Sequence, residues 1–222
     1  MYKYVMSDIH GCYDEFIKML ELINFSDEDE LYILGDVIDR GYNSLDIIDY
    51  IVSHKNITLL KGNHERMYED YFESGDALIW FSNGGQNTFN ELGRRDLYYR
   101  YTLYRIVKDL PIIKVVDKFI LVHAGLLFPS GYEDMELDKL LEYQKEDINL
   151  WTRDYLNSDI QYKDYKIICG HTPVQTIRNR IGDSTIIHRP GHIFIDCGCV
   201  HKSYLGKLGC LRLDDMKEFY IR

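Results

Sequence analysis

Aspartate, asparagine and histidine recur in five short segments of the sequence, each of which contains glycine. The segments are DIHG (residues 8–11), GDVIDRG (35–41), GNHE (62–65), HAG (123–125) and GHT (170–172). Oxygen and imidazole ligands without a thiolate suit Mn²⁺, iron or Zn²⁺ better than Cu(I) or an iron–sulfur cluster. Glycine lets the chain turn sharply and approach a bound ion or phosphate closely. The composition of these segments therefore predicts a metal site.

The spacing of the polar residues suggests how ions would be shared. Asp8 and His10 lie two residues apart, so on an extended segment their side chains point the same way and can hold one ion. Asp36 is a candidate bridge to a second ion, because bridging ligands hold two ions about 3.5–4 Å apart. Taken alone, His123 is better explained as a buried core histidine and His171 as a turn residue. The prediction therefore depends on the five segments together.

The elements that must position these segments follow from the apolar pattern. Residues 2–6, 31–34 and 57–60 predict three buried strands. Residues 12–25 and 44–54 predict the helices between them, with Ser44 as a candidate N-cap. This alternation predicts parallel pairing with right-handed crossovers. Because ligands bind beyond the carboxyl ends of strands in open α/β sheets, we expect the polar segments to converge on one edge.

The remainder of the chain also contains segments whose pattern predicts helices and strands. Residues 65–108 are mostly helical by pattern and rich in tyrosine, with a loop at 82–85, and residues 129–165 predict loop with short helices. Further apolar runs predict strands at 112–116, 119–122, 166–169, 193–195 and 208–213. The first two of these flank Asp117 and Lys118, which predicts a hairpin. No repeat, low-complexity tract or linker interrupts the pattern, so we expect one domain spanning residues 1–222.

Bulk composition narrows the class of protein. The 222 residues carry a net charge of −10, which disfavours sequence-independent nucleic-acid binding. The N-terminal segment lacks the apolar core of an export signal, and no apolar run approaches the length of a membrane span. The five cysteines are odd in number and form no CxxC pair, which predicts a reducing, cytoplasmic location without disulfides. Nothing in the sequence demands more than a monomer.

Together the five motifs resemble the signature of the calcineurin-like metallophosphoesterases. Within that family they are most similar to the phosphoprotein phosphatase branch, which includes bacterial and phage serine/threonine phosphatases and the symmetrical diadenosine tetraphosphate hydrolases. Residues 195–198 with 206–208 resemble the family's closing strand pair. The resemblance implies an α/β fold in which a β-sandwich is flanked by helices, in α/β/β/α layers, with the metal site at one edge.

The resemblance also implies a role for each polar residue. One metal would be bound by Asp8, His10 and Asp36, and the other by Asp36, Asn63, His123 and His171. His64 would be the general acid, with Asp39 as its orienting partner. Arg40 would clamp the phosphate, and Arg153 resembles a second clamp more loosely.

The activity implied is phosphoester hydrolysis by a hydroxide held between two divalent ions, with Mn²⁺ expected and iron or Zn²⁺ open. A serine/threonine protein phosphatase is the leading interpretation, because the chain is as compact as the bacterial and phage enzymes. The alternative is a symmetrical dinucleoside tetraphosphate hydrolase. The tyrosines and arginines of residues 94–105 would then line a nucleotide pocket, although tyrosines packed on the helix and arginines facing solvent are the preferred explanation.

Two further readings of the sequence are weaker. A metal-dependent nuclease is disfavoured by the net acidity. A binding protein built on an inactive enzyme fold is disfavoured because every expected metal position holds a competent residue.

One departure from the family pattern is Cys197, which stands between Asp196 and Gly198 where many members have threonine. We expect it to have little effect on the metals.

Overall fold

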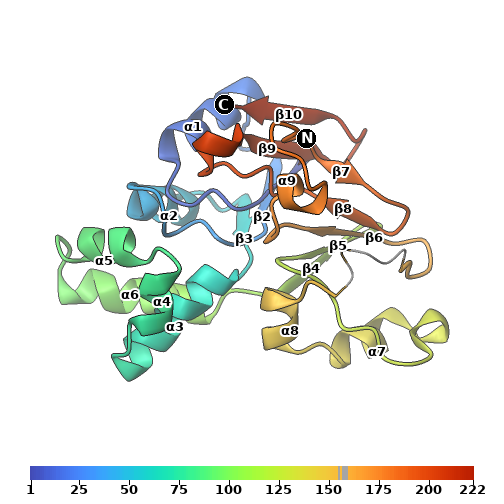
Figure 1. The fold of residues 1–222 in the computed structure, drawn as a ribbon, viewed down its shortest axis with the longest axis horizontal. Coiled ribbons are helices and arrows are strands. Elements are labelled where there is room, and N and C mark those ends of the chain that lie inside the picture. Colours follow the sequence, from blue (N-terminus) through green and yellow to red (C-terminus); the bar gives the residue numbers. More distant parts are fainter. Residues whose placement is uncertain (155, 157–159) are drawn as a thin grey trace.

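The computed structural model describes residues 1–154, 156 and 160–222 and shows an α/β fold built on two mixed five-stranded sheets. Figure 1 shows the sheets in the upper and right-hand part of the molecule, with α-helices covering their outer sides. Within the described residues, no helix is both long and apolar enough to cross a membrane.

The first sheet is built from both ends of the chain. Its strand order is β10-β9-β1-β2-β3. The three strands β1, β2 and β3 run parallel, and β9 and β10 continue the sheet antiparallel beyond β1. Their bounds are β1 Lys3–Met6, β2 Glu30–Ile33, β3 Ile57–Leu59, β9 Leu208–Arg212 and β10 Glu218–Ile221. The predicted parallel pairing of the first three strands is therefore confirmed.

The second sheet collects the later strands in the order β4-β5-β6-β8-β7. The strands β5, β6 and β8 are parallel, and the hairpin of β4 and β5 turns at Asp117 and Lys118 as predicted. Their bounds are β4 Ile113–Val116, β5 Phe119–Val122, β6 Lys166–Cys169, β7 Ile187–His188 and β8 His192–Phe194. The short edge strands β7 and β10 were not predicted from the sequence.

The helices fall into three groups around the sheets. Two helices connect the parallel strands of the first sheet, namely α1 (Tyr13–Leu22) and α2 (Ser44–Ser53). Four form a separate lobe at the lower left of Figure 1: α3 (Asn63–Ser74), α4 (Leu78–Ser82), α5 (Gln86–Leu92) and α6 (Leu97–Lys108). The rest are α7 (Leu137–Glu142), α8 (Glu146–Trp151) and the single turn α9 (Val174–Ile177).

One detail of helix α2 differs from the prediction. Ser44 is the first residue of the helix rather than its N-cap, which is Asn43. Because Ser44 is buried inside the first turn, its hydroxyl oxygen is free to accept a hydrogen bond from the backbone N–H of Asp39 at 3.0 Å. The side chain thus holds a loop of the candidate site instead of capping its own helix.

Alternation along β1 explains how the sheets pack. Tyr4 and Met6 lie on the face that packs against α1 and α2, in a cluster that includes Phe16 of α1. Val5 lies on the opposite face, in a second cluster that it shares with Ile168 of the other sheet. Since successive side chains of a strand point to opposite faces, one apolar strand serves both layers. This arrangement places the carboxyl ends of β1, β2, β3, β5 and β6 at one edge.

Candidate metal centre and active site

Three of the five polar segments, residues 8–11, 35–41 and 170–172, leave the carboxyl ends of their strands through strained backbone. Six of the ten predicted site residues have positive φ angles, of 49° to 72°: Asp8, His10, Asp36, Asp39, Arg40 and His171. Each such conformation in a residue other than glycine costs about 1–3 kcal/mol and persists only where the surroundings enforce it. Strain concentrated in this way is typical of a functional site, and it brings side chains from distant segments together.

A first group of potential ligands comes from three of these segments. The group consists of three buried residues, His10, Asp36 and His64. Each has one potential ligand atom, and these three atoms lie within 4.8 Å of one another. The Nδ1 atom of His10 lies 2.9 Å from the carbonyl oxygen of Ile38, so the proton resides on Nδ1 and the lone pair of Nε2 faces the site. That Nε2 lies 3.6 Å from Oδ2 of Asp36.

A second group shares Asp36 with the first. Asp36, His123 and His171 satisfy the same 4.8 Å condition. The Nδ1 atom of His123 lies 2.7 Å from the carbonyl oxygen of Leu34, so its Nε2 is the acceptor. This Nε2 lies 2.9 Å from Oδ1 of Asn63 and 3.4 Å from Oδ1 of Asp36. Three acceptor atoms therefore converge, and a cation is what such a group can hold.

Asp8 lies beside both groups but outside the 4.8 Å sets. Its Oδ2 accepts hydrogen bonds from the hydroxyl of Ser7 at 2.5 Å and from the backbone N–H of His171 at 3.0 Å. Its Oδ1 is buried and has no hydrogen-bond partner among the described residues. An orphaned buried acceptor is costly, so this atom fits a site for metal ions. The ring of His171 faces the second group through Nδ1, which lies 2.9 Å from Oδ1 of Asn63. Asp8 therefore lies beside the two groups, and its role as a metal ligand stays a prediction.

Burial sets the protonation of the groups that converge here. Burial lowers the pKa of His10 well below its ordinary value, and the nearby Arg40 guanidinium lowers it further. Burial likewise lowers the pKa of His123, and that of His171 to about 2. Burial raises the pKa of Asp36 well above its ordinary value, with the negative charge of Asp8 adding to the effect. Neutral imidazoles beside crowded carboxylates are a ligand set that a cation would stabilise.

His64 and Asp39 form a buried pair next to the metal ligands. The Nδ1 atom of His64 lies 2.7 Å from Oδ2 of Asp39, and both side chains are fully buried. Burial lowers the pKa of His64, while the hydrogen bond to Asp39 opposes that shift. With its proton on Nδ1, His64 presents the lone pair of Nε2 to the guanidinium of Arg40, whose second terminal nitrogen lies 3.0 Å away. The other terminal nitrogen lies 2.8 Å from His10 Nε2.

Arg153 lies near the site, within electrostatic reach of His171. Its side chain is exposed, and its positive charge contributes to lowering the pKa of His171. Trp151, two residues earlier, packs edge-on against the ring of His171 with centroids 6.0 Å apart. The structure therefore brings all ten predicted residues to one edge, with Arg153 at its rim.

Glu65 is a site residue that the sequence argument missed. It is fully buried, and its two carboxylate oxygens accept backbone N–H bonds from Asp36 at 2.8 Å, Val37 at 2.9 Å and Gly62 at 2.9 Å. One side chain thus ties the loop after β2 to the loop after β3. The available signal was its position in the first turn of α3, three residues after Gly62, as in a capping box.

Gly62 explains why these loops must contain glycine. A Cβ atom at this position would lie 2.2 Å from Oδ1 of Asp36 and 2.5 Å from its backbone nitrogen. No side chain fits in that space, so the close approach of the two loops requires glycine. The approach in turn allows the backbone N–H of His64 to donate to Oδ1 of Asp36 at 3.0 Å.

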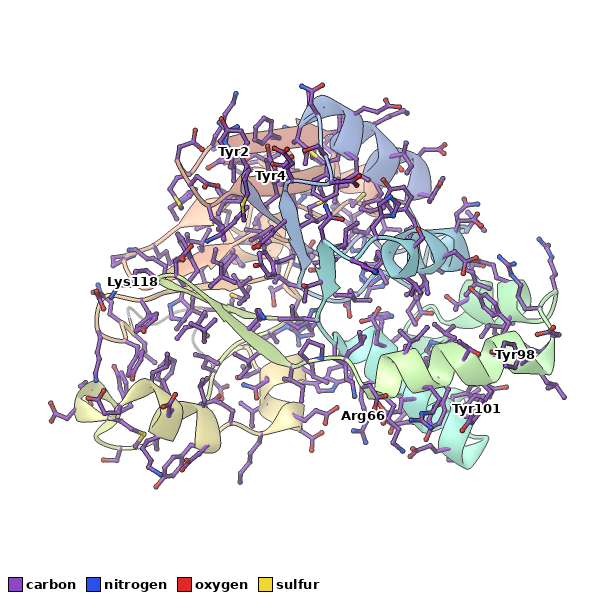
Figure 2. The ribbon with its side chains drawn as sticks, turned by 180° about the vertical axis from the view of Figure 1, so that it is seen from behind. Tyr2, Tyr4, Arg66, Tyr98, Tyr101 and Lys118 are labelled. Carbon is purple, nitrogen blue, oxygen red and sulfur yellow. The ribbon has the colours of Figure 1, made fainter. Side chains whose placement is uncertain are left out.

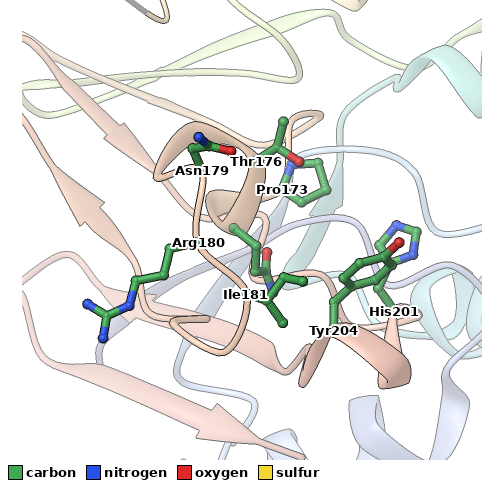
Figure 3. A pocket seen from close by; sticks show the side chains of 8 residues that line it. Pro173, Thr176, Asn179, Arg180, Ile181, His201 and Tyr204 are labelled. Carbon is green, nitrogen blue, oxygen red and sulfur yellow. The ribbon is translucent and has the colours of Figure 1, made fainter.

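An open cleft of about 680 Å³ lies beside the site. It begins at Pro173, two residues after His171, and Figure 3 shows it continuing between Ile181 and Tyr204. His201 lines the cleft and lies within electrostatic reach of Arg40, which lowers its pKa after the larger effect of burial. The cleft is therefore placed to receive part of a substrate bound at the candidate metal centre.

Most tyrosines and arginines of residues 94–105 bond to neighbouring helices or face solvent, while Arg100 and Tyr101 line a separate hollow of about 440 Å³ against α3 and α5. Arg95 and Tyr99 both bond to Asp49 on α2, and Tyr104 donates to Glu73 on α3. Figure 2 shows Tyr98 at the outer edge of α6, where its side chain is 79% exposed. The preferred explanation, in which this run packs the helix and faces solvent, agrees with these contacts.

Comparison with known proteins identifies the class to which this fold and site belong. The family model of the calcineurin-like phosphoesterases matches residues 1–195, and the chain belongs to that family. It is a metallophosphoesterase and hydrolyses phosphoric esters. The family's fold uses a dimetal centre, which agrees with two groups of potential ligands sharing Asp36.

Particular relatives carry two different activities in their names. Serine/threonine-protein phosphatase 2 of Salmonella typhimurium is 33% identical over 166 residues, which cover 71% of each chain. Serine/threonine-protein phosphatase 1 of the same organism is 29% identical over 207 residues, covering 89% of this chain and 86% of the relative. The symmetrical bis(5'-nucleosyl)-tetraphosphatase of Methylobacillus flagellatus is 33% identical over 129 residues, covering 57% of this chain and 44% of the relative.

Solved structures agree on the fold. A protein provisionally named a diadenosine tetraphosphatase matches with a TM-score of 0.70 at 16% identity, covering 99% of this chain and 92% of its own. A serine/threonine phosphatase from Saccharomyces cerevisiae matches with a TM-score of 0.61 at 15% identity, covering 96% and 72%. At these identities the matches show the fold and leave the substrate to other arguments.

Proposed function

We propose that the chain is a two-metal phosphomonoesterase that acts on phosphoserine and phosphothreonine in proteins. The observation that carries the proposal is that two groups of buried acceptor atoms share Asp36, beside the buried pair of His64 and Asp39. The first group of acceptors supports assigning His10 and Asp36 to one ion, and the buried Oδ1 of Asp8 beside them, unpaired within the described part of the chain, supports adding Asp8 to the same ion. The second supports assigning Asp36, Asn63, His123 and His171 to the other.

The cations supply Lewis acidity to the phosphoryl group and to the attacking water when they are bound. We expect Mn²⁺, with iron or Zn²⁺ as alternatives that the oxygen and imidazole ligands also suit. The protein side chains divide the remaining work. Arg40 donates to the non-bridging phosphoryl oxygens, and Arg153 at the rim is placed to add a second set of donors. Both stabilise charge on the transferring group.

His64 is proposed as the general acid. Asp39 fixes the proton of its Nδ1, so Nε2 is the atom that takes up a proton and donates it to the leaving alkoxide. The carboxylate of Asp39 then stabilises the imidazolium while the second proton is held. No covalent intermediate with the protein is required, because water is the nucleophile.

Two observations favour a phosphoprotein over a dinucleotide as substrate. The match to a protein phosphatase extends over 86% of that relative, whereas the match to a tetraphosphatase extends over 44% of its length. The residues that would have recognised a second nucleotide, Arg95, Tyr99 and Tyr104, are engaged with carboxylates of neighbouring helices.

All five cysteines are buried and free, which supports a cytoplasmic site of action.

The symmetrical tetraphosphatase remains the second candidate because the 680 Å³ cleft is large enough for a nucleoside. The test compares kcat/KM of the Mn²⁺-loaded protein for a phosphoserine peptide and for diadenosine tetraphosphate, with a chelated control. A preference for the peptide of tenfold or more supports the proposal. Faster release of two ADP from the dinucleotide replaces it with the second candidate.

A matched pair of variants tests whether the proposed site performs the reaction. His64→Asn removes the proposed acid, and we expect kcat to fall by about 10²–10⁴ on the phosphoserine peptide. His188→Asn alters an imidazole on the edge strand β7, where it pairs with Glu218, and should leave kcat unchanged. Equal activity of the two variants would refute the assignment of His64.

A further inference from the structure

The segment from Trp80 to Thr88 has no role in the chemistry described so far, although it lies against the candidate acid and the candidate phosphate clamp. It consists of the end of α4, a loop of Asn83, Gly84 and Gly85, and the start of α5. In the sequence it appeared only as a loop within a helical region. Four of its residues form hydrogen bonds with two consecutive residues of the opposite loop, Asp39 and Arg40.

Trp80 contacts the oxygen that orients the general acid. Its Nε1–H donates to Oδ2 of Asp39 at 2.7 Å, and this same oxygen accepts the Nδ1 proton of His64 at 2.7 Å. Trp80 is 1% exposed, Asp39 and His64 are not exposed at all, and solvent therefore cannot replace the indole donor. Two N–H groups converging on one oxygen fix the direction in which Asp39 presents that oxygen to the imidazole.

The backbone of Asp39 and Arg40 is held by the same segment. The N–H of Asp39 donates to the hydroxyl of Thr88 at 2.9 Å, and the N–H of Arg40 donates to the carbonyl of Gly84 at 3.0 Å. The side-chain amide of Asn87 donates to the carbonyl of Arg40 at 2.8 Å. Since both residues have positive φ angles, 72° and 64°, these three bonds help to hold a conformation that the chain would otherwise leave.

The two glycines show that the fit is close. A Cβ atom at Gly85 would lie 2.4 Å from Nε1 of Trp80, and one at Gly84 would lie 2.9 Å from Cγ of Arg40. Gly84 also has a φ angle of 99°, which side-chain-bearing residues rarely adopt. The indole and the arginine stem can therefore reach their positions only because these two side chains are absent.

We propose that the segment from Trp80 to Thr88 is a positioning element for the reaction: Trp80 orients His64 through Asp39, and Asn87 with Gly84 sets the direction of Arg40. Trp80 touches no reacting atom and is a positioning residue. The inference rests on the proposed roles of His64 and Arg40, and it adds the residues that aim them.

The first experiment removes the indole N–H and retains an aromatic side chain. Trp80→Phe, or benzothienylalanine at position 80 if the phenylalanine variant does not fold, is compared with Phe81→Leu. Phe81 belongs to the same aromatic cluster, with its ring 5.7 Å from that of Trp80, but its hydrocarbon side chain has no hydrogen to donate to Asp39. Kinetics are measured on Mn²⁺-loaded protein with phenyl phosphate and with p-nitrophenyl phosphate, which needs less help from an acid.

We expect Trp80→Phe to lower kcat for phenyl phosphate about tenfold more than kcat for p-nitrophenyl phosphate, with KM changed less than about twofold, because a hydrogen bond to a charged group is lost. Phe81→Leu should lower both rates equally or not at all. An equal loss on the two substrates with Trp80→Phe overturns the proposal, since a merely structural role predicts that result.

The second readout does not depend on activity. In metal-free, ¹⁵N-labelled protein, the Nδ1–H of His64 should give a slowly exchanging signal in the wild type and in Phe81→Leu, and should exchange at least tenfold faster in Trp80→Phe. The chain has two tryptophans, so Trp151→Phe assigns the remaining indole N–H signal to Trp80. An unchanged His64 signal in Trp80→Phe overturns the positioning role.

The two readouts separate this inference from the proposed function. If the wild type hydrolyses neither aryl phosphate, the proposed function fails while the exchange measurement still decides how Trp80 acts on His64.

A matching test of Arg40 uses Asn87→Ala, which should raise KM for both substrates by a similar factor of about three to ten, as expected for a lost hydrogen bond. An unchanged KM overturns the role of Asn87.

Discussion

Glu65→Gln is expected to destabilise the protein strongly although the substitution changes only one atom of the side chain and removes a charge. The carboxylate accepts three backbone N–H bonds of 2.8 to 2.9 Å, from Asp36, Val37 and Gly62, and a longer one of 3.5 Å from Ile38. In glutamine an NH₂ group replaces one of the two carboxylate oxygens. This group is a donor and cannot accept the backbone N–H bonds that point at it.

The magnitude follows from the geometry. If the NH₂ group replaces Oε2, the bonds from Asp36 and Gly62 are lost, and if it replaces Oε1, the bond from Val37 is lost. Hydrogen bonds to charged groups are worth about 1.5–3 kcal/mol each, so the loss is about 2–5 kcal/mol. For a chain of this size each kcal/mol moves the Tm by roughly 2–4 °C, which gives a fall of roughly 4–20 °C.

The assay is thermal unfolding of metal-free protein followed by circular dichroism, so that altered metal binding cannot contribute. Glu28→Gln is the matched control, because Glu28 is exposed and its substitution should change stability by less than about 0.5 kcal/mol. A Tm of Glu65→Gln within 2 °C of the wild type would refute the reasoning, because it would mean that the two loops hold their positions without the carboxylate.

The remaining predictions concern metals, the acid, the glycine contact and the outer tyrosines. Asp36→Asn should lower occupancy of both metal positions in elemental analysis, whereas exposed Asp27→Asn should not; two ions at full occupancy in the first variant would exclude a bridging role. Adding Mn²⁺ to chelator-stripped wild type should raise its Tm by an amount that grows with concentration, since the ion binds only the folded state; a concentration-independent Tm would argue against the site. Gly62→Ala should abolish this metal-dependent rise, because its Cβ would lie 2.2 Å from Oδ1 of Asp36; a retained rise would show that the loops separate at little cost. Tyr98→Ala should leave kcat/KM unchanged on both the phosphoserine peptide and diadenosine tetraphosphate, and a selective loss on the dinucleotide would place α6 in the substrate site.

Much of the fold could be predicted because its elements carry local patterns. The hairpin strands at 113–116 and 119–122 and the strand at 166–169 appear within a residue of their predicted bounds, since each is a short apolar run ended by polar residues. The edge strands β7 and β10 could not be predicted in this way. Glu218–Ile221 is only partly buried along its whole length, so neither alternation nor a continuous apolar run marks it.

The candidate site shows the same division. The sequence by itself determined which residues are brought to the edge, because Asp, Asn, His and Gly directly after apolar strands have few structural uses at that spacing. Only the tertiary structure decided what holds them: Glu65 bonding two loops, Trp80 bonding Asp39 from 41 residues away, and Ser44 bonding a loop instead of capping its helix. These contacts join segments that the order of residues does not relate, and a buried polar side chain reveals its purpose only through the partners that the folded chain places around it.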